Sequence, residues 1–218
     1  MKFTAKTIQV LKNFASINSC IHFKKGNILK TVNQPYTIVG MAKLDQEIEQ
    51  DFAIFDLNRF LGALSLFNNP DIKLHERYMT ITDGSKELNY VFADPATILK
   101  PKDGLALPNV ATTVKISAST LADILKALSV MGLPELALVG DGESISVQAI
   151  NSEDPTSDVF KITNLGNTDK VFKAIYKVEN LKILPGEYEV DIASKGISFF
   201  RGENIEYFVA IEKNSTMS

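Results

Sequence analysis

Apolar residues recur every three to four positions in two stretches of the first half of the chain. In residues 7–19 they share one side, while lysine, asparagine, glutamine and serine occupy the other. This spacing predicts an amphipathic helix, because 3.6 residues make one helical turn. Residues 57–64 repeat the pattern directly after Asp56, whose carboxylate is a favoured N-terminal cap. Two helices are therefore predicted in the first half.

Alternating apolar and polar residues fill the stretches around these helices. Turn-forming pairs such as Lys25-Gly26 and Gln34-Pro35 separate the runs. The predicted strands of the first half are residues 20–23, 27–32, 36–44, 52–55, 71–76, 78–83 and 87–94. Their short length and close spacing favour an antiparallel sheet.

The second half repeats this order of elements. Residues 113–132 predict a strand followed by a helix, and residues 172–184 resemble the strand-into-helix junction of residues 52–64. Further strands are expected at residues 135–140, 144–150, 157–163, 187–194, 197–202 and 206–212. The pattern indicates a duplicated α+β unit, in which each copy packs two helices on antiparallel sheet.

A stretch rich in proline and glycine divides the two copies. We therefore predict an N-terminal domain at residues 1–93, an interdomain connector at 94–110 and a C-terminal domain at 111–218. The connector also carries four large apolar residues, which are too many for a freely solvated linker: Ile98, Leu99, Leu105 and Leu107. We expect it to lie packed against the protein surface.

Charge is distributed unevenly. The first 44 residues contain seven lysines and no Asp or Glu, whereas the whole chain has 23 basic and 26 acidic residues and a formal charge of -3. The predicted helices are also basic, because they carry only the acids Asp56, Asp123 and Glu179 against Lys6, Lys12, Arg59, Lys126, Lys177 and Lys182. A run of acidic residues from Asp45 to Asp51 falls instead on a further strand-like stretch, residues 44–51. Helices lining one side of a sheet would thus present a basic surface suited to a polyanion.

Few residues are available for catalysis or metal binding. Cys20 is the only cysteine, and His22 and His75 are the only histidines. Cys20 and His22 fall short of the three or four ligands of a typical metal site, and no phosphate-binding glycine loop is present. We expect no cofactor, no metal and no enzymatic activity. The lack of a signal-like or membrane-spanning apolar run favours a cytoplasmic protein.

Several motifs resemble the DNA polymerase sliding clamps of T-even-type bacteriophages, which share the fold of proliferating cell nuclear antigen. They are "LKNFASINS" at 11–19, "AIFDLNRFLGALSL" at 53–66, "ADPAT" at 93–97, "LKILPGEY" at 181–188 and "GENIEYFVAIEKNST" at 202–216. These motifs run in order from end to end. One departure lies near Ser129, where the family tends to carry another basic residue.

The resemblance implies a clamp that encircles duplex DNA without reading its sequence and tethers the replicative DNA polymerase. Three protomers would form a ring, with the six basic residues above facing DNA. Partner peptides would enter an apolar pocket formed by Leu99, Leu105, Leu107, Val209 and Ile211. It also implies an ATP-dependent clamp loader, transcription proteins as further candidate partners, and the cytoplasm of an infected bacterial host.

Two other functions remain compatible with the residues themselves. A monomeric, non-specific nucleic-acid-binding module would also have basic helices, although it would add exposed aromatic residues for base stacking. A hydrolase built on the acidic run of residues 45–51 is the third hypothesis. For the ring, we expect residues 87–94 of one protomer to pair with residues 157–163 of the next.

Overall fold

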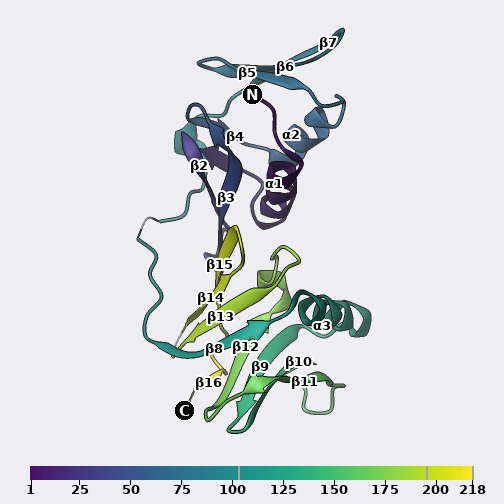
Figure 1. The fold of residues 1–218 in the computed structure, drawn as a ribbon, viewed down its shortest axis with the longest axis vertical. Helices are drawn as coiled ribbons and strands as arrows, with labels where there is room; N and C mark the ends of the chain where they lie inside the picture. The colour runs from purple at the N-terminus through teal and green to yellow at the C-terminus, as the bar shows by residue number, and fades with distance from the viewer. Residues whose placement is uncertain (103, 195, 218) are drawn as a thin grey trace. The chain divides into compact units, whose positions relative to one another are not determined.

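A computed structural model describes residues 1–102, 104–194 and 196–217 of the chain (Figure 1). It divides the protein into two compact units, Met1–Lys102 and Asp103–Ser218. The division falls within the segment 94–110 that the sequence suggests as a connector. The finer boundaries at residues 93 and 110 stay a prediction.

The first unit is built from two helices and short antiparallel strands (Figure 1). Strand β1 pairs with β4, β2 with β3, and β6 lies between β5 and β7. The elements are α1 (Ala5–Ile17), β1 (Ile21–Phe23), β2 (Gly26–Val32), β3 (Ile38–Ile48), β4 (Phe52–Ile54), α2 (Leu57–Leu64), β5 (Asp71–Leu74), β6 (Tyr78–Asp83), β7 (Lys86–Val91) and the 3-10 turn η1 (Pro95–Thr97).

Both helices of this unit begin at side-chain caps. The Thr7 backbone N–H donates to the Thr4 hydroxyl of α1, and the Arg59 N–H donates to the Asp56 carboxylate of α2. These bonds satisfy amide donors that have no partner within the helix. Leu11 and Phe14 of α1 are fully buried, and the helix packs on β2, β3 and α2. The predicted amphipathic helices and the Asp56 cap are confirmed.

The second unit contains one α-helix, α3, and two antiparallel arrays of strands within the described residues. One array has the order β11-β10-β9-β12-β16, and α3 packs on β9, β10 and β11. In the other, β8, β13, β14 and β15 are successive neighbours. The elements are β8 (Val110–Ile116), α3 (Ala118–Met131), β9 (Glu135–Asp141), β10 (Ser144–Ile150), β11 (Phe160–Asn167), β12 (Val171–Lys177), η2 (Val178–Asn180), β13 (Tyr188–Ala193), β14 (Ile197–Arg201), β15 (Ile205–Ala210) and β16 (Thr216–Met217).

The prediction of a second helix in this unit is wrong. Strand β12 ends at Lys177 and is followed only by the 3-10 turn η2, whose N-terminus has no side-chain cap. The sequence explains the difference, because Lys177 occupies the place that Asp56 holds in the first unit. A lysine cannot accept a hydrogen bond from a backbone N–H. Pro185, a few residues later, also leaves little room for a helix.

Buried tyrosines hold the chain after η2 in its non-helical conformation. The Leu184 N–H donates to the Tyr207 hydroxyl, 3.1 Å away, and the Tyr188 hydroxyl donates to the Leu184 carbonyl at 2.8 Å. Tyr188 and Tyr207 are buried in the core, which raises the pKa of both phenols, so they stay neutral donors and acceptors. Side chains thus provide the partners that a helix would have provided.

We predict that replacing Asp56 by Ala lowers the free energy of unfolding of the first unit by about 1 kcal/mol, because α2 loses its cap. Urea denaturation followed by circular dichroism measures the change. Asp56→Ser is the matched control, since a serine hydroxyl accepts the same bond, and it should recover most of the loss. Equal destabilisation by both variants would show that the carboxylate acts by something other than capping.

Candidate nucleic-acid interface

The six basic residues assigned to DNA are all exposed, but they come from different kinds of element. Lys6 and Lys12 lie on α1, Arg59 on α2 and Lys126 on α3. Lys177 is instead the last residue of β12, and Lys182 follows the 3-10 turn η2. Their expected placement on a fourth helix is therefore wrong. Their role toward DNA stays a prediction.

Lys6 and Lys12 have different electrostatic surroundings on the same helix. Asp45 accepts hydrogen bonds from the hydroxyls of Thr4 and Thr7, which hold the pKa of its carboxyl below the usual range, and the charge of Lys6 lowers it further. Lys6 thus lies beside a carboxylate. Lys12, by contrast, borders a hollow between α1 and α2 and makes no salt bridge within the described residues.

Arg59 faces the edge strand of the first unit. Together with Phe55, Asp56 and Tyr90 it lines a surface hollow of about 360 Å³ beside β7. Partial burial raises the pKa of the Tyr90 phenol, an effect that the positive charge of Arg59 opposes. The phenol also donates to the Asp56 carbonyl at 3.4 Å. This position suits a contact along β7 at least as well as a contact with DNA.

Lys177 carries a surface ion pair, with its ammonium 3.7 Å from the Glu212 carboxylate. Lys126 lies on the exposed side of α3, which also carries Asp123 and small residues such as Ser129, and it makes no ion pair in the described part of the chain. Of the six residues, Lys12, Arg59 and Lys126 make no ion pair within the described residues, and Arg59 faces β7. An exposed, uncompensated ammonium is the group that gains most from a nearby phosphate.

Each unit contains a sheet that ends at a strand with exposed apolar side chains. In the first unit this strand is β7, where Val91 is 72% exposed. In the second unit it is β11, where Phe160 and the preceding Val159 are 38% and 58% exposed. Edge strands offer unpaired backbone N–H and C=O groups, and apolar side chains favour covering them by another chain.

The five residues assigned to a peptide pocket are unequally accessible. Leu99 packs against a small cluster of Cys20, Ala53 and Ile98 in the first unit. Val209 and Ile211 are buried in the second unit, whereas Leu105 is 42% exposed and Leu107 is half-buried. Next to the Cys20 cluster, partial burial lowers the pKa of His22, and the connector residue Lys100 lowers it further. The pocket itself stays a prediction.

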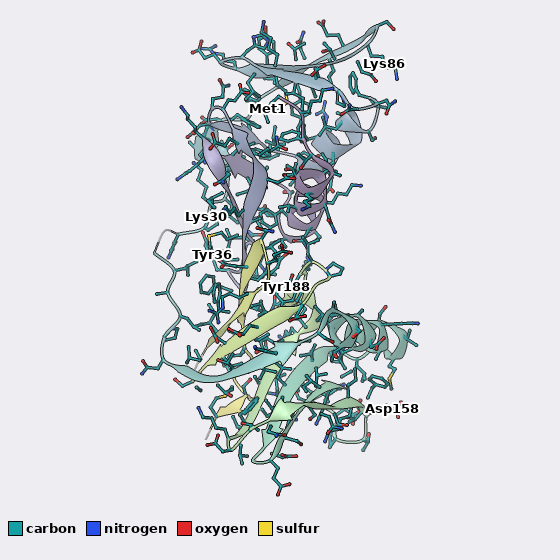
Figure 2. The ribbon with its side chains drawn as sticks, in the orientation of Figure 1. Met1, Lys30, Tyr36, Lys86, Asp158 and Tyr188 are labelled. Carbon is teal, nitrogen blue, oxygen red and sulfur yellow. The ribbon has the colours of Figure 1, made fainter. Side chains whose placement is uncertain are left out.

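Two features of the first unit were missed by sequence reasoning. Tyr36, labelled in Figure 2, is 48% exposed at the β2–β3 turn, with the left-handed φ of 58° and the Lys102 ammonium 5.9 Å from its ring centre. The sequence did contain a signal for this exposed turn position, because Tyr36 directly follows Pro35 and precedes a strand. The second feature is the hollow bordered by Lys12, of about 310 Å³, which no pattern along a single helix reveals because two helices form it.

Metal and membrane sites gain no support from the described residues. In residues 1–102, 104–194 and 196–217 no group of three or more His, Cys, Asp or Glu residues is placed to hold a metal ion. Within the same residues, every helix is too short or too polar to cross a membrane.

Solved structures share this fold over nearly the whole chain. Archaeal clamps are examples: A. fulgidus PCNA bound to the C-terminal region of FEN-1 has a TM-score of 0.71, with 15% identity over 94% of each chain. PCNA from Thermococcus kodakaraensis has a TM-score of 0.70 and 13% identity, covering 96% of this chain and 98% of that one. The α+β fold is thus that of the PCNA-like DNA clamps, as predicted.

Sequence relatives identify the family. The description "gp45 sliding clamp, C terminal" matches residues 94–213, and "DNA polymerase processivity factor" matches residues 2–100. The sliding clamp of Enterobacteria phage T4 is 31% identical over 226 residues, 99% of each chain. That of Vibrio phage KVP40 is 29% identical over 220 residues, covering 97% of this chain and 99% of the relative. The chain belongs to the gp45 sliding clamp family.

Membership confirms the function that the sequence motifs predicted, a phage sliding clamp that acts as a DNA polymerase processivity factor. A processivity factor is an accessory protein whose partners are DNA and a DNA polymerase. The hypotheses of a monomeric nucleic-acid-binding module and of a hydrolase are therefore set aside.

Proposed function

We propose that three copies of the chain close head to tail into a ring around duplex DNA, and that the ring tethers the replicative polymerase. The observation that supports this most directly is the pair of apolar sheet edges, β7 in one unit and β11 in the other. Because the two edges are different surfaces, pairing them is heterologous and generates a ring when the rotation closes.

In this proposal β7 of one protomer continues its sheet into β11 of the next. The hollow beside β7, lined by Phe55 and Arg59, would receive apolar side chains such as Val159. Backbone hydrogen bonds would satisfy both edges, and apolar burial would supply most of the stability.

DNA would meet the exposed sides of the helices, with Lys12 and Lys126 as the main phosphate contacts and Lys6, Arg59, Lys177 and Lys182 as weaker ones. Phosphate contacts carry no sequence information, so the clamp would slide. Asp45, beside Lys6, would weaken the attraction of Lys6 for phosphate, whereas the exposed acidic strand residues Glu47 and Glu49 would lie away from DNA.

Loading a closed ring requires an interface to open, which we assign to a separate ATP-dependent clamp loader, with no chemistry in the clamp itself. Residues 94–110 would act as the connector between domains 1–93 and 111–218, and would guide partner peptides. Transcription proteins are proposed as additional users of the same surface, in the cytoplasm of the infected bacterial host.

Val91→Glu should convert the trimer to monomer at micromolar concentration, because the interface would bury an unpaired carboxylate. Light scattering measures the mass. Val171→Glu is the matched control, since Val171 is 57% exposed but lies on the internal strand β12. Adding Val159→Lys to Val91→Glu should restore the trimer in part. A monomeric mass for the unmodified protein at tens of micromolar contradicts the ring.

Reversing Lys12, Lys126 and Lys182 to Glu should weaken binding to linear duplex DNA by about tenfold or more at low salt and flatten its salt dependence, because fewer counterions are released. Trimer mass should be unchanged. The control reverses Lys25, Lys43 and Lys213, three exposed lysines on other surfaces, which gives the same net charge. Equal loss in both variants would show that the overall charge attracts DNA. The DNA-facing helices, which would form the inner wall of the proposed ring, would then have no special role.

Replacing Leu105 and Leu107 by Ser should weaken binding of a polymerase peptide by about tenfold without changing the trimer, because these are the accessible members of the predicted pocket. Calorimetry with the polymerase C-terminal peptide measures the affinity. Leu66→Ser is the control, since Leu66 is 66% exposed at the end of α2. Unchanged affinity in the double variant would remove the connector from the peptide site.

A further inference from the structure

The hollow between α1 and α2 differs from an ordinary gap between surface helices. Its walls include apolar side chains that are only half-buried, among them Phe3, Ile8 and Leu61. Its volume of about 310 Å³ lies at the lower end of the range for small-molecule sites. The helices therefore leave an apolar hollow, called the slot below, that an apolar group of a ligand could fill.

The aromatic wall of this slot is held in place from behind. The Phe3 ring stacks on Phe23, with ring centres 6.0 Å apart, and meets Phe60 edge to face at 6.1 Å. These contacts fix the ring, so a ligand that packs against it does not have to immobilise it. A rigid aromatic wall of this kind suits stacking by a planar group.

The rim of the slot carries two polar groups that the described residues leave unused. Lys12 makes no ion pair, and the Asn69 side-chain amide has no hydrogen-bond partner, although the Asn69 carbonyl accepts from Lys2. Asn69 also has the left-handed φ of 55°, a conformation that asparagine tolerates better than most residues. Asp71 lies two residues after Asn69, and its carboxylate is 3.7 Å from the Lys2 ammonium. Lys2 therefore partly offsets this nearby negative charge.

These groups match the parts of a nucleotide. A planar base has apolar faces for the slot and a polar edge for an amide that both donates and accepts, and its phosphate suits an ammonium. A paired base within a duplex cannot enter, because both its faces are stacked. An apolar carboxylic acid could fill the slot and reach Lys12 but would make no use of the Asn69 amide.

We propose that this slot binds an unpaired nucleobase of a DNA strand, with Asn69 on the base edge and Lys12 on the adjoining phosphate. The inference rests on the proposed function, since α1 must face DNA. It adds to the sliding contact a site that distinguishes single-stranded from duplex DNA. Such a site would slow the clamp where a template strand becomes unpaired.

The test compares two fluorescent oligonucleotides of equal length, a single-stranded oligothymidylate and an abasic strand with the same phosphates. The trimeric protein should bind the strand with bases about fivefold or more tightly at low salt, since base stacking on an aromatic side chain adds to the phosphate contacts. Fluorescence anisotropy measures both affinities. Equal binding of the two strands overturns the proposal.

Two variants locate the effect. Ser65→Phe places a ring at the exposed rim of the slot, and Asn69→Gly removes the amide at a residue whose positive φ glycine accepts. Both should abolish the preference for bases while leaving binding of the abasic strand unchanged. Asn68→Gly is the control for Asn69→Gly and should keep the preference. Retention of the preference in both slot variants also overturns the proposal.

Binding of a blunt duplex, measured with the same proteins, separates this site from the inner wall. We expect Ser65→Phe and Asn69→Gly to bind the duplex as the parent does. If the parent protein binds duplex DNA but shows no preference for the strand with bases, the proposal of a base-binding slot is contradicted and the proposed function is not. The preference for bases could be present while reversal of Lys12, Lys126 and Lys182 leaves duplex binding unchanged. In that case the assignment of these lysines to duplex DNA is contradicted, and the base-binding slot is not.

Discussion

An antiparallel sheet leaves a row of unpaired N–H and C=O groups at each edge, and this constraint underlies the organisation proposed for the assembled protein. In this chain the strands β7 and β11 end sheets in different units, and each carries exposed apolar residues that a solitary protein would be expected to avoid. In the proposed head-to-tail ring, one neighbour covers β7 and the other neighbour covers β11. Arg59, a residue whose sequence position suggested a DNA contact, lines the hollow beside β7. In the proposed ring this residue would lie close to the edge that a neighbouring protomer covers.

Capping decides where the duplication of the chain is kept and where it is lost. The sequence was sufficient to predict α1, α2 and α3, because each has a continuous apolar stripe and a polar residue able to cap it. The prediction of a fourth helix was wrong because residues 172–184 match the strand-into-helix pattern of residues 52–64 only in their apolar positions. Lys177 replaces the cap, and Tyr188 and Tyr207 satisfy the Leu184 backbone from residues that lie later in the chain. No local pattern contains that information.

The exposure of the basic residues assigned to DNA could be predicted from the sequence, but their surroundings could not. Helical spacing correctly placed Lys12 and Lys126 on exposed sides, yet it could not show that Lys6 lies beside Asp45, since the carboxylate belongs to β3. The same limitation hid the slot at Lys12, which needs side chains from two helices, from the N-terminal residues and from residues 69–72. Pairing between distant segments is what determines the local charge, and sequence periodicity does not report it.

The distribution of compensated and uncompensated charge fits the physical demands on a sliding protein. A ring that holds DNA by its closure needs only weak attraction to phosphates, because strong fixed contacts would resist movement along the duplex. Lys6 beside Asp45 and Lys177 beside Glu212 have their fields reduced by neighbouring carboxylates. Lys12 and Lys126 make no ion pair within the described residues. A few ammonium groups without an ion pair, on long side chains, give an attraction that salt and water readily screen. In the proposed ring, retention on DNA would then depend on the strength of the subunit edges and not on the basic surface.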